Sequence, residues 1–332
     1  GKISNNPMAR KLCYVSGTRA DFGLMRSTLV LLSQHKEIEL KIVVTGTHLS
    51  DSYGKTVDEI ICAGLQISDR ISVETENMDG ADMARNISTI IRGCIKAFSR
   101  DKPDIVLLLG DRGEMLAGAI AAIHLNIPIA HIHGGERSGT VDEPVRHAIS
   151  KLSHMHFVST QSSRKRLIRM GEDEKFIYVT GAPGLDGIQD LNTLTRKQLF
   201  RSVHFSENVP TALLIHHPVL QEAEASESNT HLIMKACLDR KLQIMAIMPN
   251  SDAGNHGARS ALLEYSQETL VRIRSHLRRD EFISWLANVD LLIGNSSSGI
   301  IEAASFGTPV INIGTRQNMR DRNANVVDVP FD

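Results

Sequence analysis

The chain has 332 residues, of which 42% are hydrophobic, and its 37 basic and 38 acidic side chains give a net charge of −1. General nucleic-acid binders and membrane-surface binders need a clear basic excess, so this balance excludes them and indicates small-molecule partners. At roughly 150 residues per domain, the length favours two domains.

Short β-rich runs alternate with helix-length amphipathic segments through the first half of the chain. The predicted strands are 12–16, 40–45, 105–109, 129–133, 156–159 and 177–180, and the predicted helices are 26–33, 55–63, 114–124, 145–153 and 162–170. This alternation predicts βαβ units and therefore a parallel sheet with helices on both faces. The Gly-Ala-Pro-Gly run at 181–184 breaks the pattern and begins the predicted linker.

The alternation restarts after the linker. Strands are predicted at 212–216, 243–248, near Val271, and at 291–294 and 310–313, with helices at 230–239, 258–268, 280–288 and 298–306. The acidic polar run 221–228 is interpreted as a surface loop. We therefore predict an α/β fold of two Rossmann-like parallel-sheet domains, residues 8–183 and 184–332, around a central cleft.

The remaining composition indicates a cytoplasmic protein. The four cysteines, at positions 13, 62, 94 and 237, have neither CxxC nor zinc-site spacing, so we expect reduced thiols and no metal. No signal-peptide core is present, and no apolar run reaches the roughly 20 residues of a membrane span. Residues 1–7 are polar and precede Met8, which favours an expression-tag remnant.

Four predicted strands of the first domain are followed by loops with polar residues. These loops are Gly-Thr-Arg at 17–19, Gly-Thr-His at 46–48, Gly-Asp-Arg at 110–112 and His-Gly-Gly-Glu at 133–136. Open α/β sheets bind ligands beyond the carboxyl ends of their strands, so we expect the four loops to converge on one edge.

The acid/base candidates cluster in this part of the sequence: they are Asp111, His133, Glu136, Asp142, Glu143, Arg146 and His147. Clustered carboxylates raise one another's pKa, which allows a carboxylic acid to exchange protons near neutral pH. The structural alternative is loop capping, with Asp142 and Arg146 forming an ordinary pair four residues apart on a helix.

The segment 294–299, Gly-Asn-Ser-Ser-Ser-Gly, lies between a predicted strand and a predicted helix. Small residues allow backbone N–H groups to approach a phosphate, the hydroxyls of Ser296, Ser297 and Ser298 add donors, and a helix N-terminus favours an anion. A helix cap alone would need one serine. Because no GxGxxG or P-loop motif occurs, we expect no cofactor, and the nucleotide is predicted to be part of the substrate.

Further side chains are candidates to contact that nucleotide. Glu302 lies one turn into the predicted helix, where it can accept hydrogen bonds from a ribose diol or can simply be a solvated carboxylate. Arg316 follows the next strand and can add positive charge. Arg19 and His217 are expected to contact the ligand from opposite walls of the cleft.

Seven motifs in this order resemble the UDP-N-acetylglucosamine 2-epimerase family. They are GTRAD at 17–21, GDR at 110–112, HIHGGE at 131–136, RHAI at 146–149, HPV at 217–219, PNSDAG at 249–254 and GNSSSG at 294–299. The similarity runs from about Lys11 to Val329 and favours the hydrolysing branch, which includes the bacterial sialic-acid pathway enzyme and the epimerase half of the animal epimerase/kinase.

The resemblance implies a fold like that of the GT-B glycosyltransferases and a reaction without metal or nicotinamide. In that reaction a base removes the C2 proton of the sugar, UDP leaves C1 by anti elimination, and water adds to the glycal. The product is N-acetylmannosamine, for nonulosonic (sialic-type) acid biosynthesis.

The resemblance also implies roles for individual residues. Asp111, Glu136 and Asp142 match the functional carboxylates, with no choice among them for the base. The implied UDP contacts are Arg19, Arg112, His217, Asn250, His276, Ser296, Ser297, Glu302 and Arg316, and His147 lines the sugar site. His133, also expected to contact substrate, stands where the non-hydrolysing branch and the animal hydrolysing enzyme have a glutamate.

Three alternatives stay open. The same reaction can take UDP-N,N′-diacetylbacillosamine or a GDP-linked amino sugar, as related enzymes of legionaminic acid pathways do. The same fold can support a GT-B glycosyltransferase, which needs an acceptor, or a sugar-nucleotide binder without turnover, for which three carboxylates are superfluous. Homodimers are common in the family, so a homodimer is a further expectation.

Overall fold

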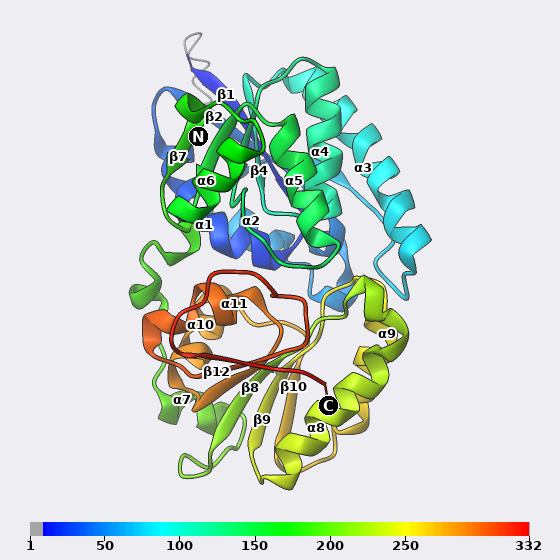
Figure 1. Cartoon of the computed structure of the whole chain (residues 1–332), viewed down its shortest axis with the longest axis vertical. Helices are drawn as coiled ribbons and strands as arrows, with labels where there is room; N and C mark the ends of the chain where they lie inside the picture. The colour runs from blue at the N-terminus through cyan, green and yellow to red at the C-terminus, as the bar shows by residue number, and fades with distance from the viewer. Residues whose placement is uncertain (1–8, 332) are drawn as a thin grey trace. The chain divides into compact units, whose positions relative to one another are not determined.

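The computed structural model describes residues 9–331 of the chain, which form two compact units (Figure 1). Unit 1 contains the described residues up to Thr75, together with Asp82–Glu136 and Asp142–Asp186. Unit 2 contains Glu76–Ala81, Arg137–Val141 and the described residues from Gly187 onward. The predicted tag remnant, residues 1–7, lies outside the described residues.

Unit 1 is built on a seven-stranded parallel sheet with the strand order β3-β2-β1-β4-β5-β6-β7. The strands are β1 (Arg10–Ser16), β2 (Ile38–Thr45), β3 (Gln66–Ile71), β4 (Ile105–Leu109), β5 (Ile129–Ile132), β6 (Met155–Val158) and β7 (Ile177–Val179). The strand order reverses between β1 and β4, and ligands of doubly wound sheets bind beside such a reversal.

Helices cover both faces of this sheet (Figure 1). They are α1 (Arg19–Gln34), α2 (Val57–Cys62), α3 (Gly80–Asp101), α4 (Gly113–His124), α5 (Asp142–Leu152) and α6 (Gln161–Arg169). Successive strand side chains point to opposite faces, so Tyr14 packs with Phe22 of α1, whereas Val15 packs with Phe98 of α3 and Met115 of α4.

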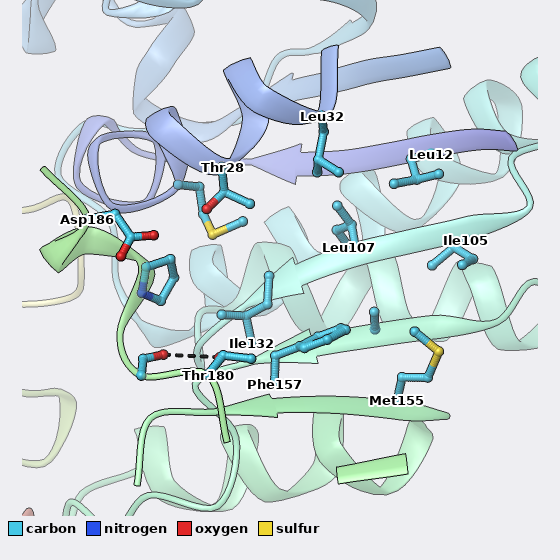
Figure 2. A pocket seen from close by; sticks show the side chains of 14 residues that line it. Leu12, Thr28, Leu32, Ile105, Leu107, Ile132, Met155, Phe157, Thr180 and Asp186 are labelled. Carbon is cyan, nitrogen blue, oxygen red and sulfur yellow. Dashed lines mark hydrogen bonds between the residues drawn. The ribbon is translucent and has the colours of Figure 1, made fainter. Parts of the chain in front are cut away.

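Apolar side chains of β1, β4, β5 and β6 line a hollow of about 310 Å³ beside α1 (Figure 2). Leu107, Ile132 and Phe157 extend into it from neighbouring strands, and Thr28 and Asp186 are among its few polar neighbours. None of the predicted site residues lines this hollow, so it is distinct from the predicted site.

Unit 2 contains a six-stranded parallel sheet with the order β10-β9-β8-β11-β12-β13. Its strands are β8 (Thr211–Ile215), β9 (Gln243–Ile247), β10 (Val271–Arg274), β11 (Leu291–Gly294), β12 (Val310–Ile313) and β13 (Val326–Val329). Its helices are α7 (Arg196–Ser202), α8 (Ser226–Asp239), α9 (Asn255–Glu264), α10 (Arg279–Asn288) and α11 (Ser297–Ile301). Here the strand order reverses between β8 and β11.

The structure corrects several sequence-based elements. The sequence analysis omits β3, α3, α7 and β13. The run at 221–228 lies mostly at the surface, as predicted, but it is not a loop: Leu220–Ala225 form a 3₁₀ helix and α8 begins at Ser226, whose buried hydroxyl donates to the Gly254 carbonyl. The helix predicted at 298–306 is interrupted at Glu302, and a separate 3₁₀ helix, Ala303–Phe306, follows. Among the described residues, no helix is both long and apolar enough to cross a bilayer.

Gly294 ends β11 in a conformation that no other residue type fits, which generates a stability prediction. Its φ is 135°, and a Cβ atom there would overlap the carbonyl oxygen of Ile215 on β8. We expect Gly294→Ala to lower the free energy of unfolding by more than about 2 kcal/mol, because this overlap adds to the backbone strain. Urea denaturation monitored by circular dichroism measures the loss.

Gly307→Ala is the matched control for this prediction. Gly307 also has a positive φ, 66°, but no atom outside its immediate neighbours lies within 4 Å of its would-be Cβ. Gly307→Ala should lower the free energy of unfolding by only about 1–2 kcal/mol, the cost of backbone strain alone. Equal losses in the two variants would contradict the close approach of β11 to β8.

Candidate active site

The acid/base candidates of unit 1 lie at the carboxyl ends of two paired strands. β4 and β5 are parallel neighbours, with Leu109 opposite Ile132. Asp111 follows β4, and Glu136 follows β5 by one short loop. Asp142 is the first residue of α5, the helix that comes next in the chain. The predicted convergence of strand-end loops therefore places two of the three carboxylates on adjacent strand ends.

Arg146 of α5 connects these groups. Its side chain is 1% exposed, its Nη2 donates to the Asp111 carboxylate, and its Nη1 donates to the Glu136 carbonyl over 2.8 Å. Burial lowers the pKa of this guanidinium, but the charges of Asp111, Glu136 and Asp142 outweigh burial and raise it. Arg146 is therefore a permanent buried cation, and Asp111 is an ion-pair partner that the sequence did not suggest.

The loop at 133–136 is packed too closely for larger residues at its centre. A Cβ atom on Gly134 would lie 2.7 Å from the Ser150 hydroxyl, and Gly135 has a φ of 75°. Glu136 then accepts two hydrogen bonds on one oxygen, from the Ser159 hydroxyl and from His133 Nδ1, each over 2.8 Å. These two hydrogen bonds fix the direction of the Glu136 side chain.

His131 is a buried support for the neighbouring loop, a role that the sequence analysis missed although its motif contains this residue. Its Nε2 lies 2.7 Å from the Gly110 carbonyl and its Nδ1 lies 2.9 Å from the Ser150 hydroxyl. Burial lowers the pKa of His131 to about 3, so the ring is neutral. A carbonyl only accepts, so Nε2 carries the hydrogen, and His131 connects the loop that precedes Asp111 to α5.

The two predicted arginine contacts of unit 1 both stand beside glutamates. Arg19, the first residue of α1, pairs with Glu59 through its Nε over 2.6 Å. Arg112, the N-cap of α4, lies 3.3 Å from Glu114. Asp21, within the first motif, is structural: its carboxylate accepts from the backbone N–H groups of residues 17 and 18 and completes the capping box of α1.

His147, predicted to line the sugar site, lies on α5 beside Arg146. Its Nε2 is 3.6 Å from the Glu143 carboxylate one helical turn earlier. Burial lowers the pKa of His147, and the nearby Glu143 opposes this change. The ring is half-buried, so it remains available to a ligand.

In unit 2, Asn295 joins the ends of β8 and β11. Its side-chain oxygen accepts from the His217 backbone N–H over 2.7 Å, and its amide donates to the His217 carbonyl over 2.8 Å. Its own carbonyl accepts from Arg316 over 2.9 Å. His217, Arg316 and the serine run are thereby fixed around one buried amide.

His217 and Asn250 are held together. The Asn250 backbone N–H donates to His217 Nδ1 over 3.0 Å, so the hydrogen of a neutral His217 ring is on Nε2. The Asn250 side chain accepts from the Asp252 backbone N–H, which orders the loop after β9. His276 follows β10, with its Nδ1 3.3 Å from the Ser275 hydroxyl.

The helix that begins at the serine run is shorter than the sequence predicts. Ser296 caps α11 by accepting from the Ser298 backbone N–H over 3.3 Å, and the two hydroxyls lie 2.8 Å apart. Because α11 has only five residues, its dipole is weaker than that of the nine-residue helix predicted there. A diphosphate here would depend on hydroxyls and on Arg316 more than on a helix N-terminus.

Glu302 is not a solvated helix-face carboxylate. It is 3% exposed and forms an ion pair with Arg279, the first residue of α10. The sequence analysis missed Arg279, because the two residues are 23 positions apart and no periodic pattern connects them. The pair holds the Glu302 carboxylate in a defined direction.

One group within the described residues has the side chains for a metal ion. The ligand atoms of Glu227, His231 and Glu264 lie within 4.8 Å of one another on α8 and α9, and both glutamates are exposed. None of the three belongs to the predicted site.

Comparisons with known proteins show the family to which the chain is similar. The family model described as UDP-N-acetylglucosamine 2-epimerase matches residues 31–332. The chain is 53% identical over 322 residues to a Legionella pneumophila protein named UDP-N,N′-diacetylbacillosamine 2-epimerase (hydrolyzing), covering 97% of this chain and 85% of that one. It is 33% identical over 325 residues to a Neisseria meningitidis UDP-N-acetylglucosamine 2-epimerase, covering 98% and 85%.

A solved structure shows the same fold. The Methanocaldococcus jannaschii UDP-GlcNAc 2-epimerase, crystallised with UDP-GlcNAc and UDP, superposes with a TM-score of 0.79 at 19% identity, covering 97% of this chain and 89% of that one. The predicted GT-B-like α/β fold with two parallel sheets is therefore confirmed.

The buried position of Arg146 generates a second prediction. Arg146→Lys keeps the charge, but it replaces the two guanidinium nitrogens that donate to the Asp111 carboxylate and the Glu136 carbonyl by a single ammonium nitrogen without the planar fork. We expect a loss of about 2 kcal/mol or more in the free energy of unfolding, measured by urea denaturation. Arg164→Lys, in the exposed pair with Glu174, is the control and should cost less than about 1 kcal/mol. If Arg146→Lys leaves the free energy of unfolding unchanged, Arg146 does not bridge the two loops.

Proposed function

The chain belongs to the UDP-N-acetylglucosamine 2-epimerase family, and we propose that it is a hydrolysing 2-epimerase, which converts a UDP-linked 2-acetamido sugar and water into UDP and the free 2-epimeric sugar. The observation that carries the proposal is the set of proton-transfer groups fixed at the ends of β4 and β5, with Asp111 and Glu136 both attached to Arg146. A binding protein has no need of this arrangement.

The first step of the proposed reaction is elimination. A base removes the proton at C2, the electron pair of that C–H bond forms the C1=C2 double bond, and the C1–O bond to UDP breaks. Unit 1 supplies the groups for this proton transfer: Asp111, Glu136 and Asp142. General acid–base catalysis of such a transfer contributes about 10²–10⁴ in rate.

The second step is hydration of the glycal. Water adds its oxygen to C1, and C2 receives a proton on the face opposite to the one that lost it, which inverts the configuration at C2. Removal and return of the proton on opposite faces require two groups. A site with several carboxylates and the Arg146 cation meets this requirement.

Unit 2 supplies the proposed nucleotide contacts. The Ser297 hydroxyl and the Arg316 guanidinium are donors for phosphate oxygens, and His217 Nε2–H adds a third. The buried Glu302 carboxylate is assigned to the ribose diol, in the direction that Arg279 fixes. Asn250 and His276 complete the set, together with Arg19 and Arg112 of unit 1. His133 and His147, also in unit 1, are assigned to the sugar.

Among substrates, we favour UDP-N,N′-diacetylbacillosamine over UDP-N-acetylglucosamine. The relative that is 53% identical carries the first name, whereas the relative that is 33% identical carries the second. Substrate preference changes more readily than fold, so the higher identity is the better guide. The free sugar product would enter nonulosonic acid biosynthesis.

An assay of sugar nucleotides without any acceptor tests the function directly. We expect the protein to release UDP and free 2-epimeric sugar in equal amounts, fastest from UDP-N,N′-diacetylbacillosamine and more slowly from UDP-N-acetylglucosamine or the GDP-linked sugar. Chromatography of the nucleotide and NMR of the sugar measure both products. Release only after addition of an acceptor would indicate a glycosyltransferase, and binding without release would indicate a non-catalytic protein.

The nucleotide site can be tested separately by calorimetry with UDP. His217→Ala and Ser297→Ala should each weaken binding by about 1–3 kcal/mol, because a buried or charge-assisted hydrogen bond is lost. Ser228→Ala is the control, since its exposed hydroxyl donates only to a carbonyl three residues away, and it should leave the affinity unchanged. Unchanged UDP affinity in both test variants would show that the nucleotide does not bind at the ends of β8 and β11.

A further inference from the structure

His133 adopts a backbone conformation that only glycine adopts freely. β5 ends at Ile132, and His133 turns the chain with a φ of 65°. Such a conformation costs about 1–2 kcal/mol for a residue with a side chain. It is held in place because the His133 N–H donates to the Phe157 carbonyl on β6 over 3.0 Å. A strained residue that its surroundings hold in place is characteristic of functional sites.

The imidazole of His133 is oriented by one carboxylate. Its Nδ1 lies 2.8 Å from Glu136 Oε1, the oxygen that also accepts from the Ser159 hydroxyl. A carboxylate only accepts, so Nδ1 carries a hydrogen and, in the neutral ring, Nε2 carries the lone pair. The side chain is 7% exposed, and its Nε2 is buried with no hydrogen-bond partner among residues 9–331.

Two arginines fix the loop from neighbouring helices. Arg146 of α5 donates to the Glu136 carbonyl, and Arg166 of α6 donates to the Gly135 carbonyl. The charged groups shown to contact this loop include Glu136 itself and these two guanidiniums, and Arg146 also pairs with Asp111. Both cations bond backbone oxygens, so neither occupies the imidazole Nε2.

From this arrangement we propose that His133 and Glu136 form a catalytic dyad, in which His133 Nε2 is the base that removes the C2 proton and Glu136 is the residue that positions the ring. The proposal rests on the proposed function and assigns the group that the three carboxylates left open. A base oriented by a carboxylate on its other nitrogen is a recurrent solution to proton transfer near neutral pH.

The proton and electron balance is complete with water as the only co-reactant. His133 Nε2 takes the C2 proton, the C–H electron pair becomes the C1=C2 bond, and UDP departs with the C1–O pair. The imidazolium is stabilised by the Glu136 carboxylate and returns its proton to solvent. Water adds to C1, and a second acid delivers a proton to the other face of C2, for which Asp111 and Asp142 remain available.

His133→Asn is the first test, because asparagine tolerates a positive φ and can still donate to Glu136, but has no Nε2. We expect kcat to fall by about 10²–10⁴, with UDP affinity within about threefold of that of the unmodified protein. His204→Asn is the matched control: His204 also has a positive φ, 59°, is exposed in unit 2, and should keep the full rate. A His133→Asn variant that binds UDP and keeps its rate would overturn the proposal.

A double-mutant cycle tests whether Glu136 acts through His133. Glu136→Gln alone should lower kcat strongly, because the carboxylate charge that stabilises the imidazolium is lost. When Glu136→Gln is introduced into the His133→Asn variant, kcat should fall by less than about threefold, because the imidazole on which Glu136 acts is already absent. If the loss of kcat in the double variant equals the product of the two single losses, the dyad is contradicted and Glu136 is an independent catalytic group.

Two readouts separate this proposal from simple misfolding and from the proposed function. Nitrogen NMR of the resting protein should show His133 with hydrogen on Nδ1, and the opposite tautomer would overturn the dyad whether or not a substrate is turned over. His133→Gly also suits the positive φ, and added imidazole should restore part of its rate. If the unmodified protein releases UDP while imidazole restores nothing, the proposed function stands and the dyad is contradicted.

Discussion

A buried guanidinium holds the acid/base edge of unit 1 in place. Arg146 is 1% exposed, and burying a lone cation costs several kcal/mol unless partners compensate for its lost hydration. The compensation comes from the Asp111 carboxylate and the Glu136 carbonyl, which belong to the loops after β4 and β5. The electrostatic requirement of one side chain therefore determines where two strand-end loops lie, and with them the groups proposed to exchange protons.

In unit 2 the strand-end loops are held together by a neutral side chain and not by a buried cation. Its sheet also reverses order at the two central strands, and the buried amide of Asn295 joins the ends of β8 and β11 through hydrogen bonds to His217. Because this connector is neutral, it does not neutralise the charge of Arg316, which donates to the Asn295 carbonyl and is proposed to bind a diphosphate. The difference suits the two proposed roles, because proton transfer needs fixed carboxylates whereas anion binding needs cations and hydroxyls.

Much of the fold and the position of the candidate site could be predicted from the sequence. The loops after the strands of a parallel sheet meet at one edge whatever side chains they carry. The strands 105–109, 291–294 and 310–313 are confirmed to the residue. Contacts between distant residues could not be predicted. Arg279 and Glu302 have no shared periodicity, and the ion pair of Arg146 with Asp111 joins residues that are 35 positions apart. The amphipathic helix α3 carried a usable signal, since Ile90, Cys94 and Ala97 recur at helical spacing and are buried.

Isotope labelling by solvent tests the central claim, elimination followed by hydration, most directly. In D₂O the released sugar should carry deuterium at C2 with inverted configuration, and in ¹⁸O-water it should carry the label at C1 while UDP stays unlabelled, because both the proton at C2 and the hydroxyl at C1 come from solvent. Direct hydrolysis would keep the original hydrogen and configuration at C2, and attack at phosphorus would place ¹⁸O in UDP. Either of those results would contradict the account.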